Sequence, residues 1–148
     1  MSSSAASSGS NAEQEVKSTL LKFLAAFENG KIELMEEFFA EDALTFPRVI
    51  MSNDIVYEID VSRFKRVAGM DPQMKQVVRE WREQHSGPPY VSLLPRDLDI
   101  KMFSDAALVT FHIERDKVLS RRTFVMAYRN GCWKIVHVHA SNVAGSGQ

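Results

Sequence analysis

The stretch GCWKIVHVHAS at residues 131–141 decides most of what the sequence predicts. A turn glycine leads into nine residues whose composition is that of a β-strand. Successive side chains of a strand point to opposite faces. Strict alternation therefore places Trp133, Ile135, His137, His139 and Ser141 on one face, and Cys132, Lys134, Val136, Val138 and Ala140 on the other. Neither face is simply polar, so we expect both to be covered, one by helices of the chain and one by a second copy.

The composition bounds the classes of protein to consider. The chain has 148 residues, 45% hydrophobic and 25% charged, which suits one globular domain with a substantial core. A formal net charge of −1 gives no general attraction for nucleic acid or an anionic membrane. A single cysteine, Cys132, excludes an internal disulfide and fits a reducing compartment. No apolar run approaches the roughly 20 residues that span a bilayer. We therefore expect a cytoplasmic protein without nucleic-acid or membrane partners.

The two ends of the chain carry little pattern. Residues 1–12 are rich in Ser and Ala and lack the apolar segment of a secretory signal. We expect a disordered leader over residues 1–12, a single domain over 13–142, and a flexible tail over 143–148.

Three helices are predicted in the first half of the chain. The first has an apolar stripe at helical spacing, formed by Val16, Leu20, Phe23, Leu24 and Phe27. Asn29-Gly30 ends it, because both residues tolerate the left-handed conformation of a C-cap. A short second helix carries Ile32, Met35, Phe38 and Phe39 on one side. Asp71-Pro72 is typical of a helix start, and the third helix buries Met74, Val77, Val78 and Trp81.

Strands dominate the second half. A short strand is predicted over Ala43–Pro47, and residues 48–69 are interpreted as a hairpin-like excursion. Three long strands follow over Leu93–Phe103, Ala106–Arg115 and Arg121–Arg129. Asn130-Gly131 is a strong hairpin signal that leads into the closing strand. Helices followed by a meander of antiparallel strands predict an α+β fold with the helices on one face of a curved sheet.

Three segments carry a resemblance to a known superfamily. Phe27–Lys31 with the following Met35–Phe46 resembles a helix-Asn-Gly-helix-strand opening, and Gly69-Met70-Asp71 resembles a Gly-apolar-Asp helix entry. The closing strand, Gly131–Ser141, resembles the pattern Gly-x-Trp-x-Ile-Val-His-x-His-x-Ser. On these segments the chain resembles the nuclear-transport-factor-2-like (cystatin-like) superfamily, in particular the SnoaL-like proteins and the association (hub) domain of calcium/calmodulin-dependent protein kinase II.

The resemblance implies a cone-shaped fold. In it, a curved mixed, mostly antiparallel sheet wraps around three N-terminal helices and leaves a cavity between them. The scaffold hosts isomerases, dehydratases, cyclases and non-catalytic modules, so the fold alone does not give the function. Arginines line the cavity of the hub domain, and their positions here are His112, Phe124 and Ala140. Because only the first is polar, the resemblance does not imply a hub-like anion pocket.

We predict a mostly apolar cavity that binds a small hydrophobic or aromatic molecule. Its predicted ligand-binding residues are Phe27, Trp81, Thr110, His112, Glu114, Arg122, Phe124, Met126, Tyr128 and Val138. If the protein is catalytic, we expect cofactor-free isomerase, cyclase or dehydratase chemistry. The alternative is a non-catalytic ligand-binding or oligomerisation module resembling the kinase association domain.

His112 is the candidate catalytic residue, because an imidazole in a cavity can exchange protons near neutral pH. Glu114 or Arg122 would polarise it. The competing interpretation is a structural histidine, with Glu114 and Arg122 forming an ion pair at the cavity mouth. His137 and His139 have metal-ligand spacing but no further ligand on their face, so we expect neither a metal nor another cofactor.

The outer face of the predicted sheet is apolar enough to need a partner. The residues expected there include Val109, Phe111, Val125, Trp133, Ile135 and His137. We therefore predict a homodimer formed sheet to sheet with two-fold symmetry.

Overall fold

The computed structural model describes residues 2–46, 67–70, 72–115 and 117–143. The helices are α1 (Ser2–Glu28), α2 (Ile32–Glu37) and α3 (Pro72–Gln84), and the strands are β1 (Phe39–Phe46), β2 (Val67–Ala68), β3 (Arg96–Met102), β4 (Ala106–Arg115), β5 (Val118–Arg129) and β6 (Cys132–Asn142). The predicted α+β class is confirmed. Most of the predicted excursion over residues 48–69, and Asp71 as a helix cap, lie outside the described residues.

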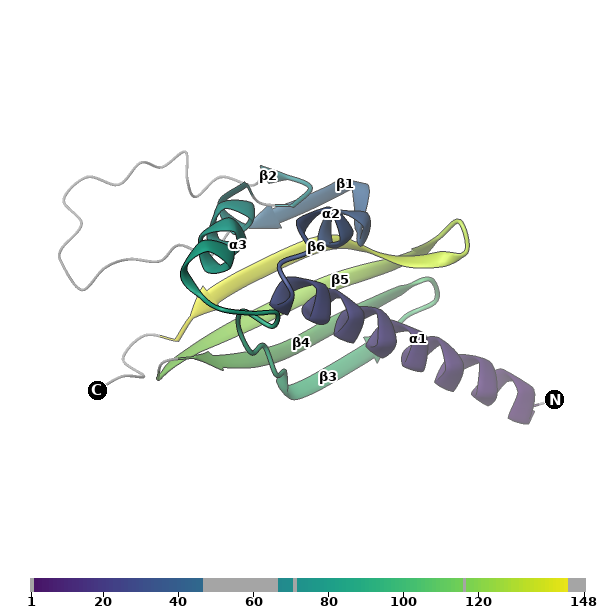
Figure 1. The fold of residues 1–148 in the computed structure, drawn as a ribbon. Coiled ribbons are helices and arrows are strands. Elements are labelled where there is room, and N and C mark those ends of the chain that lie inside the picture. The colour runs from purple at the N-terminus through teal and green to yellow at the C-terminus, as the bar shows by residue number, and fades with distance from the viewer. Residues whose placement is uncertain (1, 47–66, 71, 116, 144–148) are drawn as a thin grey trace.

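The strands form one curved sheet in the order β2-β1-β6-β5-β4-β3. β1 runs parallel to β6, and every other neighbouring pair is antiparallel. The predicted mixed, mostly antiparallel sheet is therefore confirmed. The three helices lie on the same side of the sheet, and α1 crosses it with its N-terminal part extending past the sheet (Figure 1).

The corner between α1 and α2 forms at the predicted place. Gly30 has a φ of +66°, which only glycine adopts without steric cost, and the Lys31 amide donates to the Ala26 carbonyl at 2.9 Å. At its other end α1 begins at Ser2, far upstream of the apolar stripe, and the flexibility of the leader remains a prediction. Among the helices that the structure describes, none is long and apolar enough to cross a membrane.

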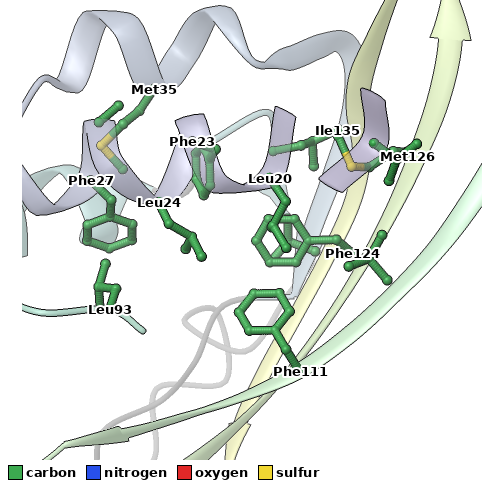
Figure 2. Close-up of a cluster of buried hydrophobic side chains, with 14 of the residues drawn as sticks. Leu20, Phe23, Leu24, Phe27, Met35, Leu93, Phe111, Phe124, Met126 and Ile135 are labelled. Atoms are coloured by element: carbon green, nitrogen blue, oxygen red, sulfur yellow. The ribbon is translucent and has the colours of Figure 1, made fainter. Parts of the chain in front are cut away.

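The core forms where α1 packs on the concave face of the sheet (Figure 2). The stripe residues Val16, Leu20, Phe23, Leu24 and Phe27 are all buried, as predicted. Phe23 lies at the centre, in edge-to-face contact with four other phenylalanines at ring-centroid distances of 5.7–6.2 Å. Such contacts add to the area burial that already fixes α1 on the sheet.

The face of β4 that points to the helices is the opposite of the predicted one. Val109, Phe111 and Ile113 are buried in the core, whereas Thr110 and His112 are only half-buried and Glu114 is exposed. Directly opposed residues of antiparallel strands share a face. Val109 opposes Phe124, and Phe124 opposes Val138, so all three point inward. The more apolar side of β4 faces the core, as the hydrophobic effect requires.

A β-bulge in β6 overturns the strict alternation expected for the closing strand. Ile135 opposes Met126, but the next residue of β5, Val125, opposes His137, so β6 contains one extra residue at Val136. The bulge changes which residues point inward. Trp133 and Ile135 before it, and Val138 and Ala140 after it, all face the helices and are buried. His137 and His139 face outward, as predicted, but Trp133 and Ile135, which were predicted to share their face, do not.

The strand β3 forms one edge of the sheet and is irregular and charged. Its pairing with β4 shifts between Arg96 and Asp99, and Asp97 within this irregularity has a φ of 53°. The side chains of Asp97, Asp99 and Lys101 are exposed. These features disfavour the addition of another strand at this edge.

Candidate ligand site on the inner face of the sheet

The inner face of the sheet changes from apolar to polar toward the C-terminal end of β6. The row Val109–Phe124–Val138 is wholly apolar and lies in the core. The next row consists of Phe111, Arg122 and Ala140, and the last consists of Ile113, Ser120 and Asn142. Register places all six of these side chains on the helix-covered face. Three polar side chains thus share one end of an otherwise apolar interior.

Ser120 and Arg122 are positioned by the alternation of β5. They are two residues apart on one strand and therefore point to the same side. The Arg122 Nε donates a hydrogen bond to the Ser120 Oγ at 2.9 Å. Ser120 is 2% exposed, and Arg122 is half-buried. Ser120 therefore holds the guanidinium along the inner face rather than letting it extend into solvent.

Asn142 completes this polar group from the neighbouring strand. It directly opposes Ser120, and its side-chain Oδ1 is buried although no described residue donates a hydrogen bond to it. A buried amide oxygen without a donor costs about 1–3 kcal/mol. Native proteins satisfy most such atoms with protein, water or ligand. Asn142 therefore marks a place where a further polar group is favoured.

Two aromatic residues predicted to close the cavity from the helices do come together. Phe27 of α1 and Trp81 of α3 have ring centroids 5.5 Å apart with an interplanar angle of 33°. Phe27 is buried and Trp81 is half-buried. The contact joins the end of α1 to α3 and supplies an apolar surface on the helix side.

The predicted catalytic residue, His112, lies on the outer face, and the prediction that it lines the cavity is wrong. It directly opposes Arg121, whose neighbour Arg122 points inward. The His112 Nδ1 lies 3.2 Å from the Asp97 Oδ2, with a direction that does not suit a hydrogen bond. Its side chain is 33% exposed, so this contact is partly solvated.

The other two β4 residues assigned to the cavity, Thr110 and Glu114, share the outer face with His112 for the same reason. Glu114 pairs with Arg96 of β3, not with Arg122. The predicted ion pair between Glu114 and Arg122 at a cavity mouth is therefore also wrong, because the two side chains lie on opposite faces of the sheet.

The remaining predicted ligand residues do point inward, but at a distance from the polar end along the strands. Phe124, Met126 and Val138 are buried beneath the helices and contribute to the core. Tyr128 lies next to the β5–β6 turn, where it is 46% exposed and its ring centroid is 5.3 Å from that of Trp133. These residues are not gathered around a single site.

The predicted dimer surface is wrong in four of its six residues. Val109, Phe111, Trp133 and Ile135 are buried within the protomer and unavailable to a partner. The indole Nε1 of Trp133 donates to the Glu15 Oε2 of α1 at 3.2 Å, which confirms its inward direction. Val125 and His137 oppose each other on the outer face, as predicted.

Two residues of the polar end, Ser120 and Asn142, were absent from the sequence-based site. Alternation from Arg122 would have found Ser120, but its strand was predicted to begin at Arg121. Asn142 lies one residue beyond the predicted end of the closing strand. Its direction depends on the bulge, for which the sequence gives no clear signal. In the part of the chain that the structure describes, no three potential metal-ligating side chains come together.

The comparisons with known proteins concern the family and the fold of the chain. The family model described as "SnoaL-like domain" matches residues 50–145, more than half of the chain. The chain belongs to the SnoaL-like family. None of the curated proteins compared with this SnoaL-like chain matches it.

Solved structures similar to this SnoaL-like protein show the same fold. The association domain of C. elegans CaMKII has a TM-score of 0.63 at 14% identity, covering 90% of this chain and 98% of that chain. A putative calcium/calmodulin dependent protein kinase II association domain from Xanthomonas campestris has a TM-score of 0.60 at 19% identity, covering 88% and 87%. An NTF-2 like protein of unknown function from Silicibacter pomeroyi has a TM-score of 0.63 at 9% identity, covering 91% and 98%. At these identities the likeness establishes the fold alone.

Proposed function

We propose that this SnoaL-like protein binds a small, largely apolar molecule against the inner face of its sheet, at the end that carries Ser120, Arg122 and Asn142. The observation that carries the proposal is the change of this face from apolar to polar over two rows of residues. Small-molecule sites in proteins combine mostly apolar walls with a few polar groups that fix orientation. His112, the predicted acid or base, faces away from this region, so the proposal is one of binding.

The apolar wall comes from residues next to the polar group. Phe111 and Ala140 flank Arg122 on the two neighbouring strands, and both are buried. Ala140 has the smallest side chain of its row, so it is the position at which a larger side chain would most restrict the surface beside Arg122. A ligand with an aromatic or aliphatic body fits this surface.

Amide chemical shifts test this proposal. Indole, toluene and phenol, added as apolar probes at millimolar concentration, are expected to shift the amides of Ala140 and Arg122. The amides of Thr110 and Val125, on the outer face, serve as controls. Ala140→Phe places a bulky side chain beside Arg122 and should abolish these shifts, whereas Ala127→Phe on the outer face should not. Shifts confined to the outer face, or no shifts with any probe, would contradict the proposal.

Self-association is a second candidate function, because two similar structures are named association domains. We propose that two copies pack through the outer faces of their sheets. Leu108, Val125 and His137 form one row of this face, and all three are half-buried in the protomer. Sedimentation velocity should then show a species of about twice the 16.7 kDa protomer, and Val125→Asp should reduce it to the protomer. A protomer-only profile for the unmodified chain at micromolar concentration would exclude the dimer.

We also propose a cytoplasmic location. The free thiol of Cys132 is exposed, which suits a reducing compartment. Fractionation of cells that produce the protein would check this, and recovery in a membrane or secreted fraction would contradict it.

A further inference from the structure

We infer that the ligand of the proposed inner-face site carries a hydroxyl group, which donates a hydrogen bond to Asn142 and accepts one from Ser120. This inference rests on the proposed function and names the chemical class of its ligand: a neutral phenol or alcohol with an apolar body. The charge of Arg122 has no part in it, because that guanidinium already interacts with Ser120 and with a further group of the protein.

Asn142 supplies an acceptor that no described residue uses. Its Oδ1 is buried and receives no hydrogen bond, although an amide oxygen can accept two. The side chain lies on the helix-covered face, because Asn142 directly opposes the buried Ser120. Native proteins satisfy most buried acceptors with protein, water or ligand. The site therefore favours a ligand group that donates a hydrogen bond.

Ser120 supplies the complementary donor. A serine hydroxyl has one hydrogen to donate and two lone pairs that accept. The Arg122 Nε donates to one of these lone pairs at 2.9 Å, and no described residue accepts the hydroxyl hydrogen. Ser120 is 2% exposed, so bulk water has little access to this hydrogen. A ligand group that also accepts a hydrogen bond would use it.

The two side chains are close enough to share one ligand atom. The Val143 amide donates to the Leu119 carbonyl at 2.8 Å. This bond flanks Ser120 and Asn142 and identifies them as a pair whose own backbones are not hydrogen-bonded to each other. Side chains of such a pair have the closest spacing in an antiparallel sheet, with Cβ atoms about 4.5–5.5 Å apart. A single oxygen atom between them can therefore reach both.

A hydroxyl is the smallest common ligand group that meets both requirements. Its oxygen donates one hydrogen bond and accepts others. A carboxylate, an ether or a ketone only accepts, so each would leave the Asn142 oxygen without a donor. The apolar body of the ligand would lie against the neighbouring row, where Phe111 and Ala140 are both buried.

Phenol, anisole and toluene test the inference, because they share a benzene ring and differ in one substituent. Phenol donates and accepts, anisole only accepts, and toluene does neither. Their dissociation constants are measured from the amide shifts of Ala140 and Arg122 at about pH 7, where phenol is neutral. Phenol should bind more tightly than anisole by roughly fivefold or more, because anisole would leave the buried Asn142 oxygen without a donor.

Asn142→Leu removes the acceptor and keeps a side chain of similar size. It should abolish the preference for phenol over anisole and leave toluene binding in place. Continued toluene binding shows that the variant is folded and that its site is intact. Ser141→Leu is the matched control, because the same side chain is introduced at the next position of β6, which faces outward, and it should leave the preference unchanged.

Two further variants keep the inference testable if Asn142→Leu binds none of the probes. Asn142→Asp keeps the shape of the side chain and offers a charged acceptor, so it should increase the preference for phenol over anisole. Asn142→Thr keeps one accepting oxygen and should retain part of the preference. A preference that is unchanged in both variants would contradict the role of Asn142.

The possible outcomes separate the two proposals. Equal affinities for the three probes at the inner face would overturn this inference and leave the proposed function standing, with water as the partner of Asn142. Equal affinities for phenol and anisole, both above that for toluene, would show that the site only donates and would also overturn the inference. A preference for phenol that survives in Asn142→Leu would place the hydroxyl elsewhere and have the same consequence. Binding of no probe by the unmodified protein would overturn both proposals.

Discussion

Substitutions at Phe111 and His112 give the sharpest test of how the sheet faces the helices. The two residues are adjacent on β4, so their side chains point to opposite faces of the sheet. Phe111 is 2% exposed, and its ring centroid lies 5.4 Å from that of Phe124. His112 is 33% exposed, and its only described charged contact is the partly solvated Asp97. Phe111→Ala and His112→Ala should therefore have very different effects on stability.

The magnitudes follow from burial. A buried phenylalanine replaced by alanine typically costs about 3–5 kcal/mol, because apolar area is lost and a cavity remains. At roughly 2–4 °C per kcal/mol for a domain of this size, Phe111→Ala should lower Tm by roughly 6–20 °C. His112→Ala removes a solvated contact and should change stability by less than about 1 kcal/mol. A double-mutant cycle between Phe111 and Phe124 should give a coupling of about 0.5–1.5 kcal/mol.

Equilibrium urea denaturation, followed by circular dichroism, measures both substitutions on the same scale. If the unfolding free energy depends on urea concentration with the same slope in the variants as in the unmodified protein, the compactness of the folded and unfolded states is preserved. If His112→Ala lowered stability more than Phe111→Ala, His112 and not Phe111 would be the residue of β4 that faces the helices. The assignment of Arg122 to the inner face would then fail with it, because that assignment depends on its pairing with Phe111.

Two further predictions concern single contacts. Gly30→Ala places a residue with a Cβ at φ = +66°, and that Cβ would lie 2.9 Å from the Arg82 side chain. The substitution should therefore lower the free energy of unfolding by about 1–2 kcal/mol or more. Gly131→Ala is the control for backbone strain alone, because Gly131 has a φ of +84° and an added Cβ there would meet no other atom within 4 Å. Equal decreases of Tm in the two variants would show that the Arg82 contact has no effect. The hydrogen bond that Arg129 donates to the Asp42 carboxylate holds the pKa of this carboxyl below its ordinary value. A folded-state pKa below the unfolded value stabilises the protein above the unfolded pKa, and this stabilisation is lost as pH falls through the folded pKa. NMR titration of the Asp42 carboxyl should show the lowered midpoint, and Arg129→Gln should return it to the ordinary range; an unchanged midpoint would contradict the pairing.

The fold was largely predictable because its determinants are local. The stripe of α1, the cap at Gly30, the hairpin at Asn130-Gly131 and the composition of the closing strand each act over a few residues. Their order then favours an α+β architecture with little ambiguity. Family resemblance added the mixed character of the sheet.

The site was less predictable because it depends on which face each strand presents. On β4 the alternation itself was visible, but the apolar side was assigned to a dimer and the polar side to a cavity. Hydrophobic burial decides this choice in favour of Phe111 over His112. On β6 the bulge at Val136 makes the residues before it point to the opposite face from the one that strict alternation predicts. The strand is too short for one extra residue to be recognised from the hydrophobic pattern of the sequence.

The irregular, charged edge strand β3 limits how this protein can associate with others. An open sheet can grow without limit when strands are added at its edge, which leads to fibres. Here the shifted pairing at Arg96 and Asp99, with the exposed charges of Asp97 and Lys101, closes that route at the β3 edge. Contact through the outer face is of a different kind, because two copies that pack face to face satisfy each other and stop. A dimer formed through the outer face, as proposed above, would therefore be a finite assembly and not the start of a polymer.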